Sequence, residues 1–271
     1  MRPIGIVGNL SLDRIEGSSP RVGGGPFHCG RALRALTRRG LIVTRSAERD
    51  RRTLLSPLVC LGLPVLWRAA ETTAAFSMSY EGDVRRMTVD ALGPVWEPGD
   101  VRGWMAKGLA SAEWVHVAPL ARGDFPAETL AELARGRRLS LDGQGLVRPD
   151  RTGPLQLDGD YDPAVLRPLS LLKLAEDEAA LVLDRLDERS LRSLGVPEVV
   201  VTLGSQGSLV LSGGKLEHVP SRTVPGTVDP TGAGDAFTAA YLTSRSAGLA
   251  PAAAARRAAA LVAELLSGRL R

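Results

Sequence analysis

Short apolar runs alternate with amphipathic stretches over most of this chain. Apolar runs of three to five residues suit buried strands, and apolar residues spaced three or four apart predict helices that cover them. The predicted strands are residues 4–7, 41–44, 115–118, 139–141, 169–173 and 199–203. The predicted helices are residues 26–38, 126–135, 176–183, 234–247 and 251–266. This alternation is typical of an α/β protein in which helices cover both faces of a mostly parallel sheet.

The segment 64–92 breaks the alternation. It holds three strand-like runs, 65–67, 73–80 and 84–89, with little helical pattern between them. Glu81-Gly82-Asp83 predicts a hairpin turn between the second and third runs. The residues alone leave open that this segment is an ordinary edge hairpin of the main sheet.

The run VDPTGAGDAF, residues 228–237, carries the most specific chemistry in the sequence. A helix is predicted to begin within it, so the backbone N–H groups of residues 232–235 lack helical partners and suit phosphate oxygens. The predicted anion hole consists of Gly232, Ala233 and Gly234. At its rim Asp235 is placed to accept the proton of an attacking hydroxyl. The alternative is a glycine-rich turn with an aspartate in the first turn of a helix.

Other segments match the same family in the same order, and together they resemble the ribokinase-like (PfkB) family of small-molecule kinases. The matching segments are residues 8–13, 23–29, 173–179, 202–207 and 228–237. The resemblance covers residues 4–267 and implies a ribokinase-like three-layer α/β/α fold, with residues 1–271 forming one kinase domain. It also implies transfer of the γ-phosphate of ATP to a hydroxyl of a sugar, cyclitol or nucleoside, with Mg²⁺ and possible K⁺ as cofactors.

The resemblance assigns a role to each candidate residue. It implies that Asp235 is the catalytic base. The substrate-binding candidates are Asn9, Ser11, Asp13, Gly24, Gly25, His28 and Cys29. The nucleotide-binding candidates are Thr202, Gly204, Ser205 and Gly207. Glu178 is expected to hold Mg²⁺ through water, and Asp229 to form part of a monovalent-cation site.

Several of these residues also have a purely structural interpretation. Asp13 suits a turn in which it caps local N–H groups. The glycines 23–25 suit a flexible loop that leads into a helix, and 202–207 suits a hairpin between 199–203 and 208–211. Glu178 suits an exposed helix surface.

In the ribokinase-like family, strands inserted at 10–22 and 64–92 form a small lid over the substrate. In this segment Ala74, Phe76 and Met78 lie on one face, and the other face consists of Thr73, Ala75, Ser77 and Ser79. A lid sheet of this size cannot bury an apolar face alone, and exposed strands pair readily with another chain. We therefore expect a homodimer formed through the lid.

The sequence departs from the family pattern at several positions. Ala175 stands where members usually carry Asn, and bulky Phe27 and His28 replace small residues. Fewer residues follow Asp235 than in typical members. Three segments, 71–73, 141–148 and 229–231, resemble inositol-kinase-like members.

Two other functions compete with the kinase. A non-catalytic sugar or nucleotide sensor on a decayed kinase fold would explain Ala175, although a pure binder has no need of the base Asp235. A nucleotide-repair lyase of the same fold also uses a Gly-x-Gly-Asp turn, but the lid strands and the turn 8–13 disfavour it.

Composition narrows the classes of partner. The chain of 271 residues is 44% apolar and 24% charged, as in ordinary globular proteins, and carries a net charge of +4. The densest basic stretch, 31–52, lacks interleaved aromatic residues, which disfavours a nucleic-acid surface. No apolar run reaches membrane-spanning length, so we expect no membrane partner and a cytoplasmic location. Cys29 and Cys60 are the two cysteines, which argues against a disulfide framework or a zinc site.

Overall fold

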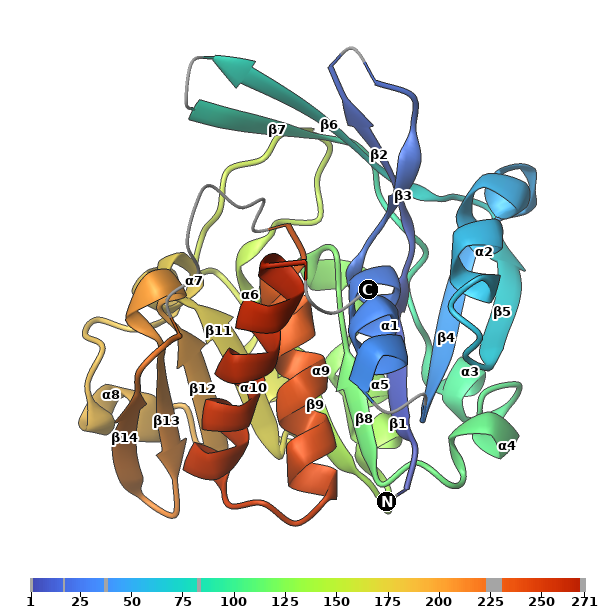
Figure 1. Cartoon of the computed structure of the whole chain (residues 1–271). Coiled ribbons are helices and arrows are strands. Elements are labelled where there is room, and N and C mark those ends of the chain that lie inside the picture. Colours follow the sequence, from blue (N-terminus) through green and yellow to red (C-terminus); the bar gives the residue numbers. More distant parts are fainter. Residues whose placement is uncertain (1, 17, 37–38, 82–83, 223–230, 269–271) are drawn as a thin grey trace.

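A large, mostly parallel sheet forms the centre of the protein (Figure 1). The structure is a computed structural model and describes residues 2–16, 18–36, 39–81, 84–222 and 231–268. The strand order across the sheet is β14 (Lys215–Val219), β13 (Ser208–Ser212), β12 (Glu198–Thr202), β11 (Leu171–Ala175), β9 (Arg138–Asp142), β8 (Trp114–Val117), β1 (Ile4–Asn9), β4 (Gly40–Ala47) and β5 (Val65–Ala70). All pairings from β12 to β5 are parallel, whereas β13 and β14 are antiparallel.

Helices cover both faces of this sheet and give the predicted three-layer arrangement (Figure 1). One layer contains α1 (Gly25–Leu36), α2 (Arg51–Val59), α9 (Ala233–Ser246) and α10 (Pro251–Leu266). The other contains α3 (Pro98–Arg102), α4 (Ala106–Leu109), α5 (Ala127–Ala134), α6 (Gln144–Val147), α7 (Glu176–Val182) and α8 (Glu188–Ser193). Leu33 and Leu242 pack with Ile6 in the first core, and Leu133 packs with Val115 in the second. The predicted ribokinase-like α/β class is confirmed.

A second, five-stranded sheet forms the lid above the carboxyl ends of the main strands (Figure 1). Its order is β10 (Gly153–Pro154), β7 (Val84–Ala91), β6 (Ala74–Glu81), β2 (Ser11–Ile15) and β3 (Arg21–Gly23). The strands predicted at 73–80 and 84–89 therefore do not form an edge hairpin of the main sheet. The strand β6 pairs instead with β2, which lies within 10–22, and β7 pairs with β6 and β10.

One boundary of the predicted lid is wrong. The run 65–67 lies in β5, which pairs in parallel with β4 at the edge of the main sheet, with Val65 opposite Ile42. The strand β5 joins this edge of the main sheet because Val65 packs against the core beneath α1 and α2. Gly82 and Asp83 of the predicted hairpin turn lie outside the described residues.

The apolar side of the lid faces inward. Phe76, Met78 and Met87 line a cavity between the lid and the main sheet. The other side carries polar contacts, including a hydrogen bond from Ser77 Oγ to Asp90 and an ion pair of 3.6 Å between Arg14 and Asp90. The apolar residues that suggested dimerisation are thus buried within the chain itself.

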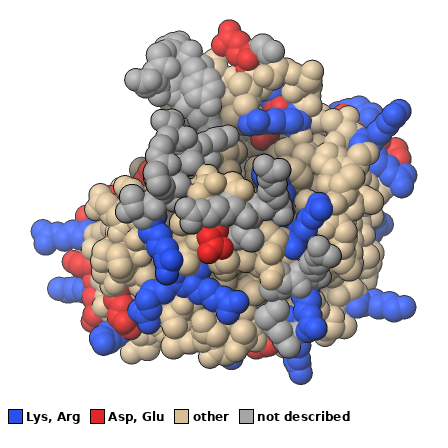
Figure 2. All heavy atoms as spheres, in the orientation of Figure 1, with Lys and Arg blue, Asp and Glu red and all other residues tan. Residues whose placement is uncertain are grey.

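Charged side chains are spread over the surface. On the face shown in Figure 2, Lys and Arg lie at several separate places and do not gather into one continuous patch. Among the helices that the structure describes, none has the length and apolar character needed to cross a membrane.

Candidate active site

The residues of the predicted anion hole lie at the N-terminus of α9. Gly232 adopts the left-handed conformation, with φ 78°, and its carbonyl accepts the first helical hydrogen bond, from Ala236 N at 2.9 Å. A side chain at Gly232 would also collide with the His28 ring, because an added Cβ would lie 2.7 Å from Nδ1. The N–H groups of the residues between Gly232 and Ala236 have no carbonyl partner within the helix and are suited to an anion.

Asp235 lies in the first turn of α9 and is largely enclosed. Cys29 Sγ donates to its backbone carbonyl at 3.5 Å and lies 3.7 Å from Oδ1. Gly25 gives the carboxylate room, since an added Cβ there would lie 3.2 Å from Oδ1 and 2.3 Å from Ala118 Cβ. Burial, followed by the negative charge of Asp142, raises the pKa of Asp235 to about 7, and the Lys173 ammonium acts in the opposite direction. A carboxylate with this pKa is suited to accept a proton near neutral pH.

Two cavities meet at this helix terminus. The lid cavity, about 540 Å³, contains Gly232 and Asp235 in its wall, and the apolar cavity, about 410 Å³, contains Ala233 and Gly234. The four residues are consecutive, so the first turn of α9 separates the two spaces. Molecules bound in the two cavities would face each other across the anion hole.

The lid cavity combines polar and apolar side chains. Its polar lining includes Asp13 on the lid strand β2, His28 on α1, and Gln144 and Arg148 at α6, and its apolar lining includes Phe76, Met78 and Met87 of the lid. The remaining lining residues are Ser11, Gly24, Gly25, Leu120, Ala175, Asp177 and Thr231. Asp13 accepts a hydrogen bond of 2.7 Å from Ser11 Oγ, which orients its carboxylate. Such a lining suits a compact molecule with several hydroxyl groups.

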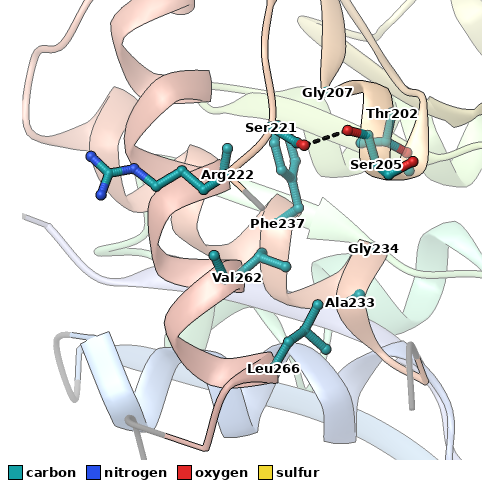
Figure 3. Close-up of a pocket in the computed structure, with 13 residues that line it drawn as sticks. Thr202, Ser205, Gly207, Ser221, Arg222, Ala233, Gly234, Phe237, Val262 and Leu266 are labelled. Carbon is teal, nitrogen blue, oxygen red and sulfur yellow. Dashed lines mark hydrogen bonds between the residues drawn. The ribbon is translucent and has the colours of Figure 1, made fainter. Parts of the chain in front are cut away.

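The apolar cavity lies between α9, α10 and the turn after β12 (Figure 3). Phe237 comes from α9, whereas Val262 and Leu266 come from α10. The opposite wall consists of Thr202, Gly204, Ser205 and Gly207. Gly207, with φ 101°, admits no side chain, because an added Cβ would lie 2.1 Å from the carbonyl oxygen of Val219. Ser221 Oγ donates to the Ser205 carbonyl and thereby holds this turn against the segment that follows β14 (Figure 3).

A buried ion pair lies beneath the anion hole. Lys173 Nζ on β11 lies 3.4 Å from Asp142 Oδ2 on β9, and both side chains are almost fully buried. On the next strand His116 contacts Ser140 Oγ through Nδ1 at 3.1 Å. Burial lowers the pKa of His116 to about 4, so this ring stays neutral.

Glu178 is held at the start of α7. Its Oε2 accepts a hydrogen bond of 2.7 Å from Ala175 N, which caps the helix. Burial, followed by the charge of Asp142, raises the pKa of Glu178 to about 7. The Asn usually found at position 175 is replaced by an alanine that itself lines the lid cavity.

The structure brings together most of the residues singled out from the sequence, with four exceptions. Glu178 lines neither cavity and caps α7 instead. Asn9 is fully buried and holds the chain by donating to Pro94 O and accepting from Trp96 Nε1, so it does not line the lid cavity. Cys29 is also fully buried and lies behind Asp235. Asp229 lies outside the described residues.

Sequence reasoning assigned no role to several cavity residues. Gln144 and Arg148 lie in the segment 141–148, whose inositol-kinase-like pattern was the available signal. The Lys173–Asp142 pair had no sequence signal, because its members lie 31 positions apart and meet only through strand pairing.

Comparisons with known proteins identify the family of this chain. Residues 105–268 match the family described as pfkB family carbohydrate kinase. A fructokinase from Escherichia coli is 27% identical over 250 residues, which are 89% of this chain and 74% of the relative. A fructokinase from Salmonella thompson is 31% identical over 150 residues, which are 51% of this chain and 66% of the relative.

Solved structures share the fold at lower identity. A pyrophosphate-dependent kinase of the ribokinase family, complexed with a pyrophosphate analog and myo-inositol, superimposes with a TM-score of 0.83 at 24% identity and covers 97% of this chain and 94% of the other. Arabidopsis thaliana ribokinase, complexed with ribose and ATP, gives a TM-score of 0.76 at 20% identity over 98% and 92% of the two chains.

Proposed function

This chain belongs to the PfkB family of carbohydrate kinases, and from that premise we propose that Asp235 activates a hydroxyl of a sugar, cyclitol or nucleoside for attack on the γ-phosphate of ATP. The family membership makes the protein a phosphotransferase that acts on hydroxyl groups. Beyond this activity, we propose which residues act in the reaction, which compound donates the phosphoryl group and which cavity holds each substrate.

The meeting of two cavities at the N-terminus of α9 carries this proposal. Phosphoryl transfer requires the attacking and leaving oxygens to lie on opposite sides of the phosphorus atom. An acceptor in the lid cavity and a donor in the apolar cavity approach the anion hole from two sides. The helix N–H groups then bind the transferred phosphoryl group between them.

Asp235 acts as general base. Its carboxylate accepts the acceptor's hydroxyl proton while that oxygen forms a bond to the γ-phosphorus and the bond from phosphorus to the leaving oxygen of ADP breaks. The products are the phosphorylated acceptor, ADP and a proton that Asp235 releases to solvent. Because the carboxyl has a pKa near 7, a large fraction is ionised at neutral pH.

The apolar cavity favours ATP as donor. Its lining by Phe237, Val262 and Leu266 suits the planar base of a nucleotide, whereas pyrophosphate has no apolar part to occupy this space. Pyrophosphate is the second candidate, because a protein with the same fold is described as pyrophosphate-dependent.

Glu178 is the residue that we propose as the partner of Mg²⁺. Carboxylate and phosphate oxygens together suit this ion, which usually retains several waters. No group of three His, Cys, Asp or Glu side chains suited to a metal is found within the part of the chain that the structure describes. Donor phosphates and water would therefore supply most ligands, and the ion would neutralise phosphate charge. Potassium binding at Asp229 stays a prediction from the resemblance.

The proposed acceptor is a polyol held by Asp13, His28, Gln144 and Arg148. These side chains provide donors and acceptors for several adjacent hydroxyl groups, while the lid excludes water from above. Sugars such as fructose and cyclitols such as myo-inositol are the first compounds to test, because relatives and structural neighbours are described by these substrates.

One screen tests the proposal. Purified protein is incubated with Mg²⁺, either ATP or pyrophosphate, and a panel of sugars, inositols and nucleosides, and the phosphorylated product is measured by mass spectrometry. We expect acceptor-dependent product with ATP and none with the Asp235→Asn variant. If product forms with pyrophosphate but not with ATP, the phosphoryl donor is pyrophosphate. If no combination of donor and acceptor gives product, the result favours a non-catalytic sugar or nucleotide sensor.

A homodimer through the lid and a cytoplasmic location also stay proposals. Because Phe76 faces inward, a substitution there would not test a dimer contact. The substitution is therefore made on the outer side of the lid, where Thr88 and Asp90 lie. Light scattering at micromolar concentration should give twice the monomer mass, and Thr88→Arg should reduce it. A monomer mass for the unmodified protein would rule out the dimer.

A further inference from the structure

A single buried ammonium group lies among the carboxylates of the candidate site. The basic charge of the chain is nearly all arginine, and two of its three lysines, Lys107 and Lys215, are exposed. Lys173 differs from them, because its side chain is only 7% exposed to solvent. Burying an ammonium group costs considerable free energy unless it is paired, so its retention at this place calls for a reason.

The position of Lys173 is fixed from one side by Asp142. Nζ lies 3.4 Å from Asp142 Oδ2, and Asp142 is in turn held by a hydrogen bond of 3.1 Å from Gln144 N to Oδ1. The two residues are opposite each other in the register between β9 and β11. Neither side chain can therefore move far without breaking a buried contact.

On its other side the ammonium faces the anion hole. A Cβ added to Gly234 would lie 3.2 Å from Lys173 Nζ and 3.8 Å from its Cε. Lys173 is therefore a close neighbour of Gly234 from a different element, the strand β11. The charge of Lys173 thus lies directly behind the peptide units that would bind the transferred phosphoryl group.

Several charged groups surround Asp235, and the Lys173 ammonium offsets the repulsion between the carboxylates among them. Asp142, Lys173, Arg148 and Cys29 influence Asp235 directly, and Glu178 and His28 lie nearby on α7 and α1. The carboxylates in this set would repel both an ionised Asp235 and an incoming phosphate. Lys173 offsets this repulsion from the buried side, and Arg148 does so from the cavity side.

We propose that Lys173 is a positioning residue of phosphoryl transfer, whose ammonium, oriented by Asp142, keeps Asp235 ionised at neutral pH and strengthens the anion hole from behind. This inference rests on the proposed function of the site. It differs from a purely structural ion pair, because a structural pair would stabilise the fold without changing the titration of Asp235 or the transfer rate.

The titration of Asp235 is the first test, and it needs no enzyme activity. Protein labelled with ¹³C at aspartate carboxyls is titrated by NMR, and the Asp235 signal is assigned by its absence in Asp235→Asn. We expect Lys173→Met to move the midpoint about one pH unit higher, because a neighbouring cation is lost, and Asp142→Asn to move it lower, because a neighbouring anion is lost. Unchanged midpoints in both variants would overturn the proposal.

Transfer kinetics are the second test. Lys173→Met should reduce kcat at pH 7 about 10- to 100-fold, with the acceptor KM changed less than threefold, because the interaction strengthens as phosphoryl charge develops. Lys107→Met, which removes an exposed lysine, is the matched control and should leave kcat unchanged. A wild-type kcat in Lys173→Met would contradict the proposal even if its melting temperature fell.

Folding of the single variant is a separate matter. Lys173→Met leaves the Asp142 carboxylate buried and unpaired, so the double variant Asp142→Asn/Lys173→Met serves where the single variant is insoluble. We expect the double variant to fold, to titrate Asp235 at a higher midpoint than Asp142→Asn alone, and to transfer more slowly than Asp142→Asn. Equal midpoints and rates in these two variants would assign Lys173 to the fold alone. Failure of the wild-type protein to phosphorylate any acceptor would reject the proposed function, while the NMR titration would still decide whether Lys173 controls Asp235.

Discussion

At the scale of single residues, the site depends on glycines that admit close neighbours and on carboxylates with distinct surroundings. Gly232 and Gly25 leave space beside His28 and Asp235, respectively. Asp13 lies at the lid cavity with its orientation fixed by Ser11, whereas Asp235 is enclosed and has a pKa near 7. Two aspartates of one site are thereby suited to different tasks, one to bind hydroxyl groups and the other to accept a proton.

Asp13→Ala should raise the KM for the hydroxylated acceptor at least 10-fold and change the KM for ATP less than twofold. The reason is that Asp13 lines the lid cavity but not the apolar cavity. Steady-state kinetics with each substrate varied in turn give both values, and Asp184→Ala, at an exposed position, is the control. Equal effects on both substrates would assign Asp13 to the fold.

The enclosed Asp235 should also make the fold less stable as pH rises. Its pKa is raised to about 7 in the folded state, so its favourable contribution is present below about pH 4 and is lost as pH rises through 7. The amide of Asp235→Asn does not ionise, so the variant should lack this pH-dependent loss of stability. The free energy of unfolding of Asp235→Asn, relative to that of the wild-type protein, should therefore be higher at pH 8 than at pH 5 by about 2–3 kcal/mol. Denaturant unfolding at the two pH values measures it, and a gain independent of pH would refute the raised pKa.

At the scale of elements, the sequence predicted the long, strongly patterned segments well. The helices expected at 26–38 and 251–266 appear as α1 and α10, and the strands at 4–7 and 199–203 appear as β1 and β12. Their apolar residues face the cores, so local pattern and burial coincide.

Other elements had weak local signals. The helix α2 is charged and contains Pro57, and α4 and α6 have four residues each, too few to show a helical period. The pattern of 64–92 predicts that β5 belongs to the lid, because the sequence of this strand does not indicate which sheet it joins. That choice depends on β4 and the core beneath α1, which are distant in sequence.

The α10 helix supplies a test of the donor site. Val262→Glu places a carboxylate in the apolar cavity, where it should repel donor phosphates and deprive the base of an apolar contact. We expect the KM for ATP to rise at least 10-fold, while the acceptor KM stays within twofold.

The matched control for this test is Arg256→Glu, which adds a carboxylate to an exposed position of the same helix and should leave both constants unchanged. An unchanged KM for ATP in Val262→Glu would mean that the nucleotide does not use this cavity.

At the scale of the whole molecule, the order of motifs along the chain predicted the family and the fold, and both are confirmed. The motifs also predicted which residues gather around α9, since Ser11, Asp13, Gly24, Gly25 and His28 all reach the lid cavity. The sequence could not predict that Asn9 would turn away to bond Trp96, or that Lys173 would lie behind Gly234. Both placements result from contacts between distant elements, which local pattern does not encode.

The proposed reaction also explains the arrangement of the molecule. Asp142 ends β9 and Thr202 ends β12, so both lie at the carboxyl ends of parallel strands, where open α/β sheets bind ligands. The lid lines one cavity at that end. The helix α10 and the turn after β12 line the other (Figure 3). One helix terminus then serves both substrates.

The central claim is that Asp235 is the base for phosphoryl transfer at this terminus. The most direct measurement compares wild-type protein and Asp235→Asn for transfer from ³²P-labelled ATP to the best acceptor, alongside calorimetric titration of each protein with an ATP analogue. The amide keeps the shape of the side chain but accepts no proton, so transfer should fall about 10²–10⁴-fold while analogue affinity changes less than threefold. Transfer at the wild-type rate by Asp235→Asn would contradict the claim.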